Sequence, residues 1–341
     1  MPTFSIVVPA YNSKDYLEEC IGSVLHQGFK DWQLVLIDDG STDGTSAICD
    51  KYAELDSRID AYHIKNSGPL AARSFGIVNA EGRYVIPLDA DDAIHPSTLA
   101  ICAKIITMHQ PDIVFMGITS HPDFSDDTQH EMLNGTYVED SFGNIKRYVC
   151  SGSFNNMCGR VFRREVLEDA VSDRYMKFSE DWYQLLDVVK GSSAAFGCPR
   201  PLYYYRTNDD STMHSPALDN YDDLRCTFLK LSEVAREWGC DCRNAACRAM
   251  SQHLAGLLTN SLLASSDDEL REIASKCSVF INEFDLGTPV SFHLNDVYRA
   301  VVVQLVGHGL CRIAKSLVNF RTRVLSFAAV CRGWTEERWV K

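Results

Sequence analysis

The sequence predicts an α/β protein: a mostly parallel sheet flanked by helices, with a helical extension at the C-terminal end. Three observations predict it. Short apolar runs alternate with helix-period segments through the first 120 residues, at the pitch of successive βαβ units. Polar or acidic residues follow four of these runs, as expected where parallel strands end at one edge of a sheet. From about residue 216 onward, apolar residues recur at helical spacing.

The strands are predicted from short apolar runs that are rich in β-branched and aromatic residues. The first helix should begin at Ser13, whose side chain can cap it, because apolar residues repeat at helical spacing from Tyr16 to Leu25. Further helices are expected through Ile48 and Tyr52, over Leu70–Ala80, and from Pro96 to near Met108. The expected strands are Phe4–Val8, Gln33–Ile37, Ala61–Ile64, Tyr84–Leu88 and Asp112–Met116.

The domain organisation follows from the length and from a change in pattern. A chain of 341 residues is long enough for two domains, or for one large domain with an appendage. Residues 1–120 carry the alternating pattern, whereas residues 121–215 are more polar and have looser periodicity. Pro216 and the polar stretch after it mark a boundary. We therefore expect one domain over residues 1–215, built from these two halves, and a helical domain over residues 216–341.

The composition excludes several classes of protein. A net charge of −13 argues against nucleic-acid binding, which needs a basic face to neutralise phosphates. The thirteen cysteines are scattered and odd in number, and none of their groupings has the spacing of a zinc site. No basic and apolar leader with a cleavage site precedes the first strand. The expectation is a cytoplasmic protein with reduced thiols.

Chemistry is expected at the predicted strand ends, which carry residues that a hydrophobic core would not use. Closely spaced carboxylates are costly to hold without a cation between them, so Asp89, Asp91 and Asp92 fit Mg²⁺ or Mn²⁺ bound with phosphate oxygens. An acidic turn such as Asp38-Asp39 can accept hydrogen bonds from a base or a ribose, although a single acidic strand end more often caps a helix. The strand-end residues are Pro9, Tyr11, Asn12, Asp38, Asp39, Asn66, Arg73, Asp89, Ala90, Asp91 and Asp92.

Four motifs built on these residues occur in a fixed order. They are Ser5–Asn12, Asp38–Thr45, Asn66–Gly68 with Ala71–Arg73, and Leu88–Asp92. Together they resemble the family 2 glycosyltransferases, inverting enzymes of the GT-A fold that use nucleotide-diphosphate sugars. The resemblance is strong over about residues 4–100, patchier to about residue 215, and ends there. It implies a GT-A catalytic domain over residues 1–215, with the nucleotide-sugar half in residues 1–120 and the acceptor half in residues 121–215.

The resemblance also assigns roles. It implies that the strand-end residues from Pro9 to Asp91 bind the donor, joined by Arg206, which neutralises the leaving diphosphate. A divalent cation, Mn²⁺ or Mg²⁺, would be held by Asp91 or Asp92 and completed by His214. Asp181 would be the general base, with Glu180 beside it at a helix start. The plainer interpretation of Glu180 and Asp181 is a helix N-terminus, where the helix dipole favours carboxylates. The plainer interpretation of Arg206 is an edge strand that exposes its arginine.

The implied function is transfer of a sugar, from UDP in most of the family, to a glycan or polyprenyl-linked acceptor in cell-surface polysaccharide synthesis. The sugar itself is not implied, because the chain has Pro69, Ser74 and Arg160 where relatives commonly have leucine, asparagine and lysine. The alternative function is a catalytically silent subunit that binds nucleotide sugars or acts as a scaffold in an envelope polysaccharide complex.

The C-terminal end differs in charge from the rest of the chain. Residues 291–341 carry eight Lys and Arg against three Asp and Glu, a charge of +5 that leaves −18 on the remainder. This basic and partly apolar segment can lie on an anionic membrane surface, which predicts a peripheral protein on the inner face of the cytoplasmic membrane. It can equally be a core helix with a basic edge.

Overall fold

A computed structural model of the chain describes residues 1–124, 142–207 and 220–264, with isolated residues beyond 264. Contacts within the chain divide it into two compact units, Met1–Ser211 and Thr212–Lys341. The sequence places the corresponding boundary between residues 215 and 216.

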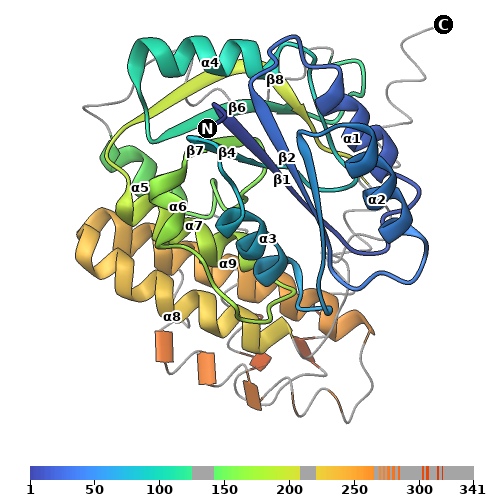
Figure 1. The fold of residues 1–341 in the computed structure, drawn as a ribbon. Helices are drawn as coiled ribbons and strands as arrows, with labels where there is room; N and C mark the ends of the chain where they lie inside the picture. Colours follow the sequence, from blue (N-terminus) through green and yellow to red (C-terminus); the bar gives the residue numbers. More distant parts are fainter. Residues whose placement is uncertain are drawn as a thin grey trace, which may run out of the picture. The chain divides into compact units, whose positions relative to one another are not determined.

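The first unit is built on an eight-stranded sheet in the order β3-β2-β1-β4-β7-β6-β8-β5 (Figure 1). The strands β3, β2, β1 and β4 run parallel, as do β6 and β8, whereas β7 is antiparallel to both β4 and β6 and β5 is antiparallel to β8. The predicted α/β class is confirmed, and the two antiparallel strands are an addition to it. The strands are β1 Phe4–Ala10, β2 Trp32–Asp38, β3 Ile59–His63, β4 Tyr84–Pro87, β5 Ala93–Ile94, β6 Ile113–Thr119, β7 Arg160–Arg163 and β8 Ala195–Tyr204.

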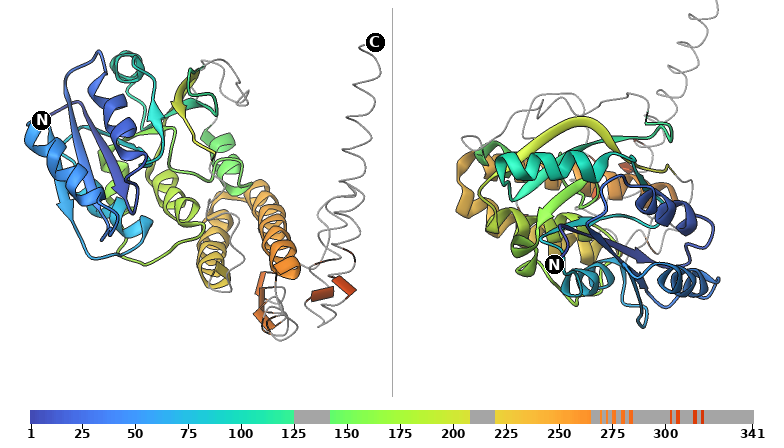
Figure 2. Two further views of the ribbon diagram at one scale, coloured as in Figure 1. Left: turned by 90° about the vertical axis from the view of Figure 1, so that its right-hand side faces the viewer. Right: turned by 45° about the horizontal axis from the view of Figure 1, so that its top comes forward.

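Helices cover both faces of this sheet, because alternate residues of a strand point to opposite faces. On β1, Phe4, Ile6 and Val8 join the core cluster that contains α1 and α4. On the other face, Val7 lies against Gly76 of α3, so that α3 packs opposite α1 (Figure 2). The helices of this unit are α1 Leu17–Leu25, α2 Thr45–Leu55, α3 Pro69–Val78, α4 Thr98–His109, α5 Phe142–Cys150, α6 Arg164–Glu168 and α7 Glu180–Gly191.

The predicted start of the first helix is wrong. The helix α1 begins at Leu17, with Tyr16 at its N-cap position and no side-chain hydrogen bond from that cap. The carbonyl of Ser13 accepts the N–H groups of Tyr16 and Leu17, and its hydroxyl donates to the carbonyl of Tyr11. Ser13 therefore stabilises a turn before the helix. Serine is favoured in such turns as well as at helix caps, so the residue type alone does not tell the two roles apart.

Gly82 lets the loop before β4 approach β1 closely. Its N–H donates to the hydroxyl of Ser5 over 2.7 Å, and a Cβ at this position would lie 2.3 Å from the Ser5 nitrogen. We expect Gly82→Ala to lower the free energy of unfolding by about 1–3 kcal/mol, because backbone atoms must move to admit the methyl group. The matched control is Gly22→Ala in α1, where a Cβ meets nothing within 4 Å and alanine should add about 0.5–1 kcal/mol. Urea denaturation of both variants tests the pair; equal changes would contradict it.

The second unit contains two long helices in its described part, α8 Asn220–Trp238 and α9 Cys240–Ala264, which pack against each other. The buried face of α8 includes Tyr221, Leu224, Phe228 and Leu231, which repeat at helical spacing. Among the described helices, none combines the length and the apolar run needed to cross a membrane. Most of the basic segment 291–341 lies outside the described residues.

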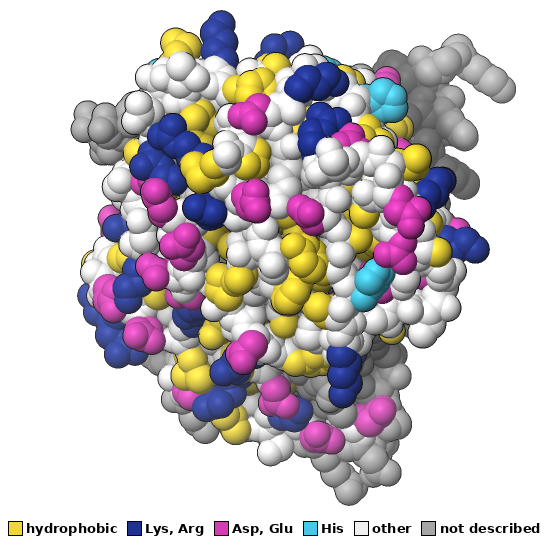
Figure 3. Space-filling model, in the orientation of Figure 1, with side chains coloured by type: hydrophobic (Ala, Val, Ile, Leu, Met, Phe, Trp, Pro, Cys, Tyr) yellow, Lys and Arg dark blue, Asp and Glu magenta, His cyan; other side chains and the backbone are white. Residues whose placement is uncertain are grey.

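Charged side chains of both signs are interspersed on the face of the molecule in Figure 3, with apolar side chains between them. The acidic surplus of the chain is therefore not gathered into one patch on that face.

Candidate active site

Three of the strand ends named from the sequence lie side by side. Ala10 pairs with Asp38 in the parallel register of β1 and β2, and Val7 pairs with Pro87 of β4. The loops that follow these strands therefore leave the sheet at one edge, where ligands bind in open α/β sheets.

The turn after β2 is held by its own two aspartates, each about 3% exposed. Asp39 accepts hydrogen bonds from the N–H and hydroxyl of Ser67, at 2.6 and 3.0 Å, and from the N–H of Gly68 at 2.9 Å. Asp38 accepts from the Ser41 N–H and the Ser46 hydroxyl. Burial alone would raise the pKa of Asp38, but hydrogen bonds from Ser41, Ser46 and His63 hold it below its ordinary value. Both carboxylates therefore shape the loops of the edge.

The loop after β1 is fixed to the same turn. Asn12 adopts a φ of 49°, donates its N–H to the Ser41 hydroxyl and accepts the Thr42 N–H on Oδ1 over 2.9 Å. Pro9 lies within β1, and the Tyr11 side chain is 53% exposed. Gly40, with φ 74°, allows Asn66 to approach, since a Cβ would lie 2.8 Å from the Asn66 nitrogen. The exposed Tyr11 ring thus stands on a rigid loop beside the edge.

His63 at the end of β3 bridges two carboxylates. Its Nδ1 lies 3.0 Å from Asp38 and its Nε2 2.9 Å from Asp50 of α2. The hydrogen bond to Asp38, and then that to Asp50, raises the pKa of His63 in the folded state. A raised pKa stabilises the fold fully below the unfolded value of about 6.5, and that stability is lost as the pH rises through the folded pKa.

We therefore expect His63→Asn to reduce the free energy of unfolding more at about pH 5.5 than at about pH 9. The difference should stay below about 1 kcal/mol, because the His63 side chain is 42% exposed and solvent screens the pairs. Urea denaturation at the two pH values measures it, with His109→Asn in α4 as the control. A larger loss at the higher pH would contradict the assignment.

The acidic turn after β4 is buried on one side. The N–H of Asp92 donates to the carbonyl of Asp89, and the Asp92 side chain, 1% exposed, accepts the Tyr203 hydroxyl at 2.6 Å and the Arg206 N–H at 2.8 Å. Burial, and then the charge of Asp89, raises the pKa of Asp92 to about 8. Burial also raises the pKa of Asp89, to about 6, although Arg73 opposes the shift. Ala90 between them is buried.

Arg73 of α3 joins this turn to the start of α7. Its guanidinium is 3% exposed and lies 2.6 Å from Asp181 and 3.8 Å from Asp89. Its Nη1 also donates to Gln184 Oε1 over 3.3 Å. Burial alone would lower the pKa of Arg73, but the carboxylates of Asp181, Asp89 and Glu180 raise it above the ordinary value. The guanidinium is therefore a fixed positive charge between the two acidic groups.

The acidic pair predicted at a helix start occupies the first turn of α7. Ser179, at its N-cap position, has a φ of 61°. The second oxygen of Asp181 accepts the N–H of Met157 over 2.9 Å, so both oxygens have a cationic or N–H partner. Burial, and then the charge of Asp181, raises the pKa of Glu180 to about 7.

Arg206 after β8 is tied to the acidic turn. Besides its N–H to Asp92, its Nε donates to the carbonyl of Asp91 and its Nη2 pairs with Glu19, at 2.8 and 2.7 Å. His214, expected to complete a metal site, lies outside the described residues. The structure thus brings Arg206 to the Asp89–Asp92 turn and tests nothing about His214.

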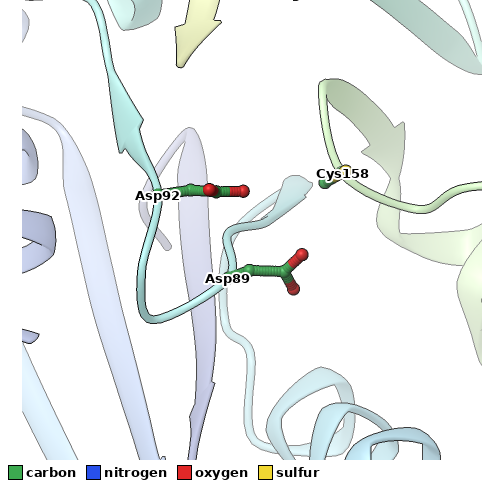
Figure 4. Close-up of side chains that lie close together, drawn as sticks. All are labelled: Asp89, Asp92 and Cys158. Atoms are coloured by element: carbon green, nitrogen blue, oxygen red, sulfur yellow. The ribbon is translucent and has the colours of Figure 1, made fainter. Parts of the chain in front are cut away.

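Cys158, which sequence reasoning missed, lies at the same place. Ligand atoms of Asp89, Asp92 and Cys158 are all within 4.8 Å of one another, and Figure 4 shows the side chains of Asp89 and Asp92 pointing toward the loop that carries Cys158. Cys158 comes from the loop before β7, whose antiparallel insertion beside β4 has no clear pattern in the sequence. Two carboxylates and a thiol are a donor set that fits a divalent cation.

Arg160 of β7 is a second buried guanidinium, and its hydrogen-bond acceptors among the described residues are carbonyl and amide oxygens. It donates to the carbonyls of Cys158 and Gly159 and to Asn156 Oδ1, and it lies 4.9 Å from the centre of the Phe115 ring. Burial lowers its pKa to about 10. Arg160 therefore braces the loop that carries Cys158.

Comparison with known proteins identifies the larger part of the first unit. Residues 5–171 match the family described as Glycosyl transferase family 2. Glycosyltransferase GlyA of Streptococcus pneumoniae is 28% identical over 215 residues, which are 61% of this chain and 31% of GlyA. Minor teichoic acid biosynthesis protein GgaB of Bacillus subtilis is also 28% identical over 215 residues, 61% of this chain and 23% of GgaB. The chain thus matches about a third or less of these relatives' lengths.

The fold resembles that of a solved structure. The crystal structure of S. aureus TarS residues 1–349 in complex with UDP-GlcNAc superposes with a TM-score of 0.69, at 20% sequence identity. The match covers 94% of this chain and 92% of that one. At this identity the likeness concerns the fold, and it supports the GT-A arrangement of sheet and helices.

Proposed function

Residues 5–171 are a family 2 glycosyltransferase domain, and we propose that this domain transfers a sugar, with inversion, from a nucleotide-diphosphate donor to an acceptor hydroxyl. One observation carries the proposal: the buried guanidinium of Arg73 contacts Asp89 at the end of β4 and Asp181 at the start of α7. Arg73 thereby holds Asp89, which is suited to bind the donor, close to Asp181, which is suited to accept a proton.

The donor is proposed to be a UDP-sugar. The support is the family resemblance of the strand ends and the UDP-GlcNAc found in the TarS complex. Tyr11, on its fixed loop, offers an exposed ring to the base. The loops held by Asp38, Asp39, Asn12 and Asn66 line the nucleotide, and Arg206 offers positive charge to the diphosphate.

A divalent cation, Mg²⁺ or Mn²⁺, is proposed at the Asp89–Asp92 turn, with Asp91, Asp92 and His214 as the ligands implied by the family resemblance. The carboxylate oxygens of Asp89 and Asp92 fit such an ion, since with the Cys158 sulfur they lie within 4.8 Å of one another, and the guanidinium of Arg73 lies 3.8 Å from Asp89. When bound, the ion neutralises charge that develops on the leaving diphosphate.

Asp181 is proposed as the general base. Arg73 and the Met157 N–H each hold one of its oxygens, and every carboxylate oxygen keeps a further lone pair for the acceptor hydroxyl. The acceptor oxygen, losing its proton to Asp181, attacks the anomeric carbon from the face opposite the diphosphate. Inversion follows from this single displacement. Because burial raises the pKa of Glu180 to about 7, this neighbouring acid is only partly ionised near neutral pH.

The acceptor is proposed to be a glycan or polyprenyl-linked glycan of cell-surface polysaccharide synthesis. GgaB carries teichoic acid biosynthesis in its name, and residues 291–341 have a charge of +5. We propose that this basic segment rests on anionic lipid near the acceptor. Sedimentation with anionic vesicles at low salt tests this: the full chain should bind, and a chain ending at residue 290 should not.

The proposed function is tested by donor hydrolysis with the purified full chain. A panel of nucleotide sugars is incubated with Mn²⁺ or Mg²⁺, with and without chelator. Hydrolysis of one donor that stops on chelation supports the transferase and identifies the sugar. If no donor is cleaved, calorimetry with UDP and Mn²⁺ follows. Absence of both hydrolysis and UDP binding would overturn the proposed donor site.

A further inference from the structure

Cys158 is a nucleophilic side chain that the proposed reaction does not use. Its thiol is free and 4% exposed. Its sulfur accepts a hydrogen bond from the Asn156 amide over 3.4 Å, and Arg160 donates to the backbone carbonyl of Cys158. The thiol therefore occupies a fixed position, facing the carboxylates of Asp89 and Asp92 (Figure 4).

Cys158 differs from the other buried cysteines of the sheet unit in the carboxylates beside its sulfur. Cys20, Cys49, Cys102 and Cys158 all belong to the apolar core cluster. The sulfur of Cys102 lies 3.8 Å from that of Met116, and the sulfur of Cys20 lies 3.5 Å from the carbonyl oxygen of Asp89. Among the described residues, the sulfur of Cys158 is the one grouped with the carboxylate oxygens of two aspartates.

The spacing of the three ligand atoms suits a tetrahedral cation. Zinc–sulfur bonds of about 2.3 Å and zinc–oxygen bonds of about 2.0–2.2 Å place neighbouring ligand atoms roughly 3.4–3.7 Å apart. The observed atoms lie within 4.8 Å of one another, so binding a common ion would bring them closer by at most roughly 1 Å. Three protein ligands leave a fourth position for a water or a phosphate oxygen.

We propose that Cys158 is a thiolate ligand of the divalent cation at the Asp89–Asp92 turn, with Asp89, Asp92 and Cys158 as its protein ligands in place of the set implied by the family resemblance, and that the site therefore prefers thiophilic cations such as Zn²⁺ or Co²⁺ to Mg²⁺. The inference rests on the proposed function for its location at the donor diphosphate. On binding, the thiol proton passes to solvent and the sulfur forms the bond to the cation. Hard cations gain little from sulfur, whereas Zn²⁺ and Co²⁺ bind thiolates strongly.

The test uses Co²⁺ as an optical probe with the full chain, because cobalt bound to a thiolate absorbs strongly in the near ultraviolet and cobalt bound only to oxygen does not. The wild-type protein should develop this band with one Co²⁺ per chain, and Zn²⁺ should displace it. Cys158→Ser should lose the band, and Asp92→Asn should weaken Co²⁺ binding by about 10-fold or more. Cys102→Ala, at a cysteine away from the turn, should keep both the band and the affinity.

Two results would overturn the inference: Co²⁺ that binds the wild-type protein without a thiolate band, or a band that persists in Cys158→Ser. Calorimetry with UDP and Mn²⁺ separates this from failure of the proposed function. UDP binding without a thiolate band removes Cys158 as a ligand and leaves the transferase intact. A thiolate band in a protein that binds no UDP keeps the cation site and removes the donor assignment. Circular dichroism of each variant confirms that it is folded.

Discussion

Asp181→Asn should reduce sugar transfer by a factor of about 10²–10⁴ while leaving the binding of UDP with a divalent cation unchanged within a few-fold. The amide keeps the shape of the side chain, and its oxygen can still accept the N–H of Met157. It cannot accept the proton of the acceptor hydroxyl. The loss should therefore appear in the turnover number, measured with donor and acceptor saturating, and calorimetry should report the nucleotide affinity.

The control for this variant is Asp187→Asn, a carboxylate farther along the same helix α7. It should transfer sugar at the wild-type rate. If Asp181→Asn retains wild-type turnover, Asp181 is not the base. If it loses UDP binding as well as turnover, its role is in the structure of the donor site and not in proton transfer.

Arg73→Met should lower the free energy of unfolding by about 3 kcal/mol, the lower end of the cost of removing one partner from a buried ion pair. The methionine leaves Asp181 without its cation at 2.6 Å and Asp89 without its cation at 3.8 Å. The estimate takes the lower end because the Asp181 side chain retains 20% exposure. Urea denaturation measures the loss.

Two further variants make this result specific. Arg83→Met, at an exposed arginine, should change the free energy of unfolding by less than about 0.5 kcal/mol. The double variant Arg73→Met with Asp181→Asn should be less destabilised than the sum of the two single changes, because the second change removes the charge that the first left unpaired. Additive losses would mean that Arg73 and Asp181 do not stabilise each other.

The sequence predicted the parallel half of the sheet well, because apolar runs and helical periods alternate there. It also placed Tyr11, Asp39 and Asp89 at one edge, since parallel strands end together. It could not show that the carboxylates of Asp38 and Asp39 would be occupied by nearby hydroxyl and N–H groups, because such hydrogen bonds depend on loop conformation.

Contacts between distant segments were also beyond the sequence. The resemblance places Arg73 among the donor-binding residues, but its position between Asp89 and Asp181 depends on where α7 packs. Cys158 was counted among scattered thiols, because residues 121–215 have too little periodicity to place the loop before β7. Ser13 shows that the residue type also limits the prediction of local structure, because serine is favoured both at helix caps and in turns.

The position of β7 has a consequence for the order in which the chain folds during synthesis. One edge of β4 is covered by β1, and the other pairs with β7, with Val85 opposite Phe162. A nascent chain that has not yet emerged beyond Arg160 therefore exposes the open edge of a strand whose residues are all buried in the finished protein. Such edges recruit strands from other chains. Ribosome-bound intermediates, and truncations made before Arg160, should consequently be the forms of this protein that depend most on chaperones.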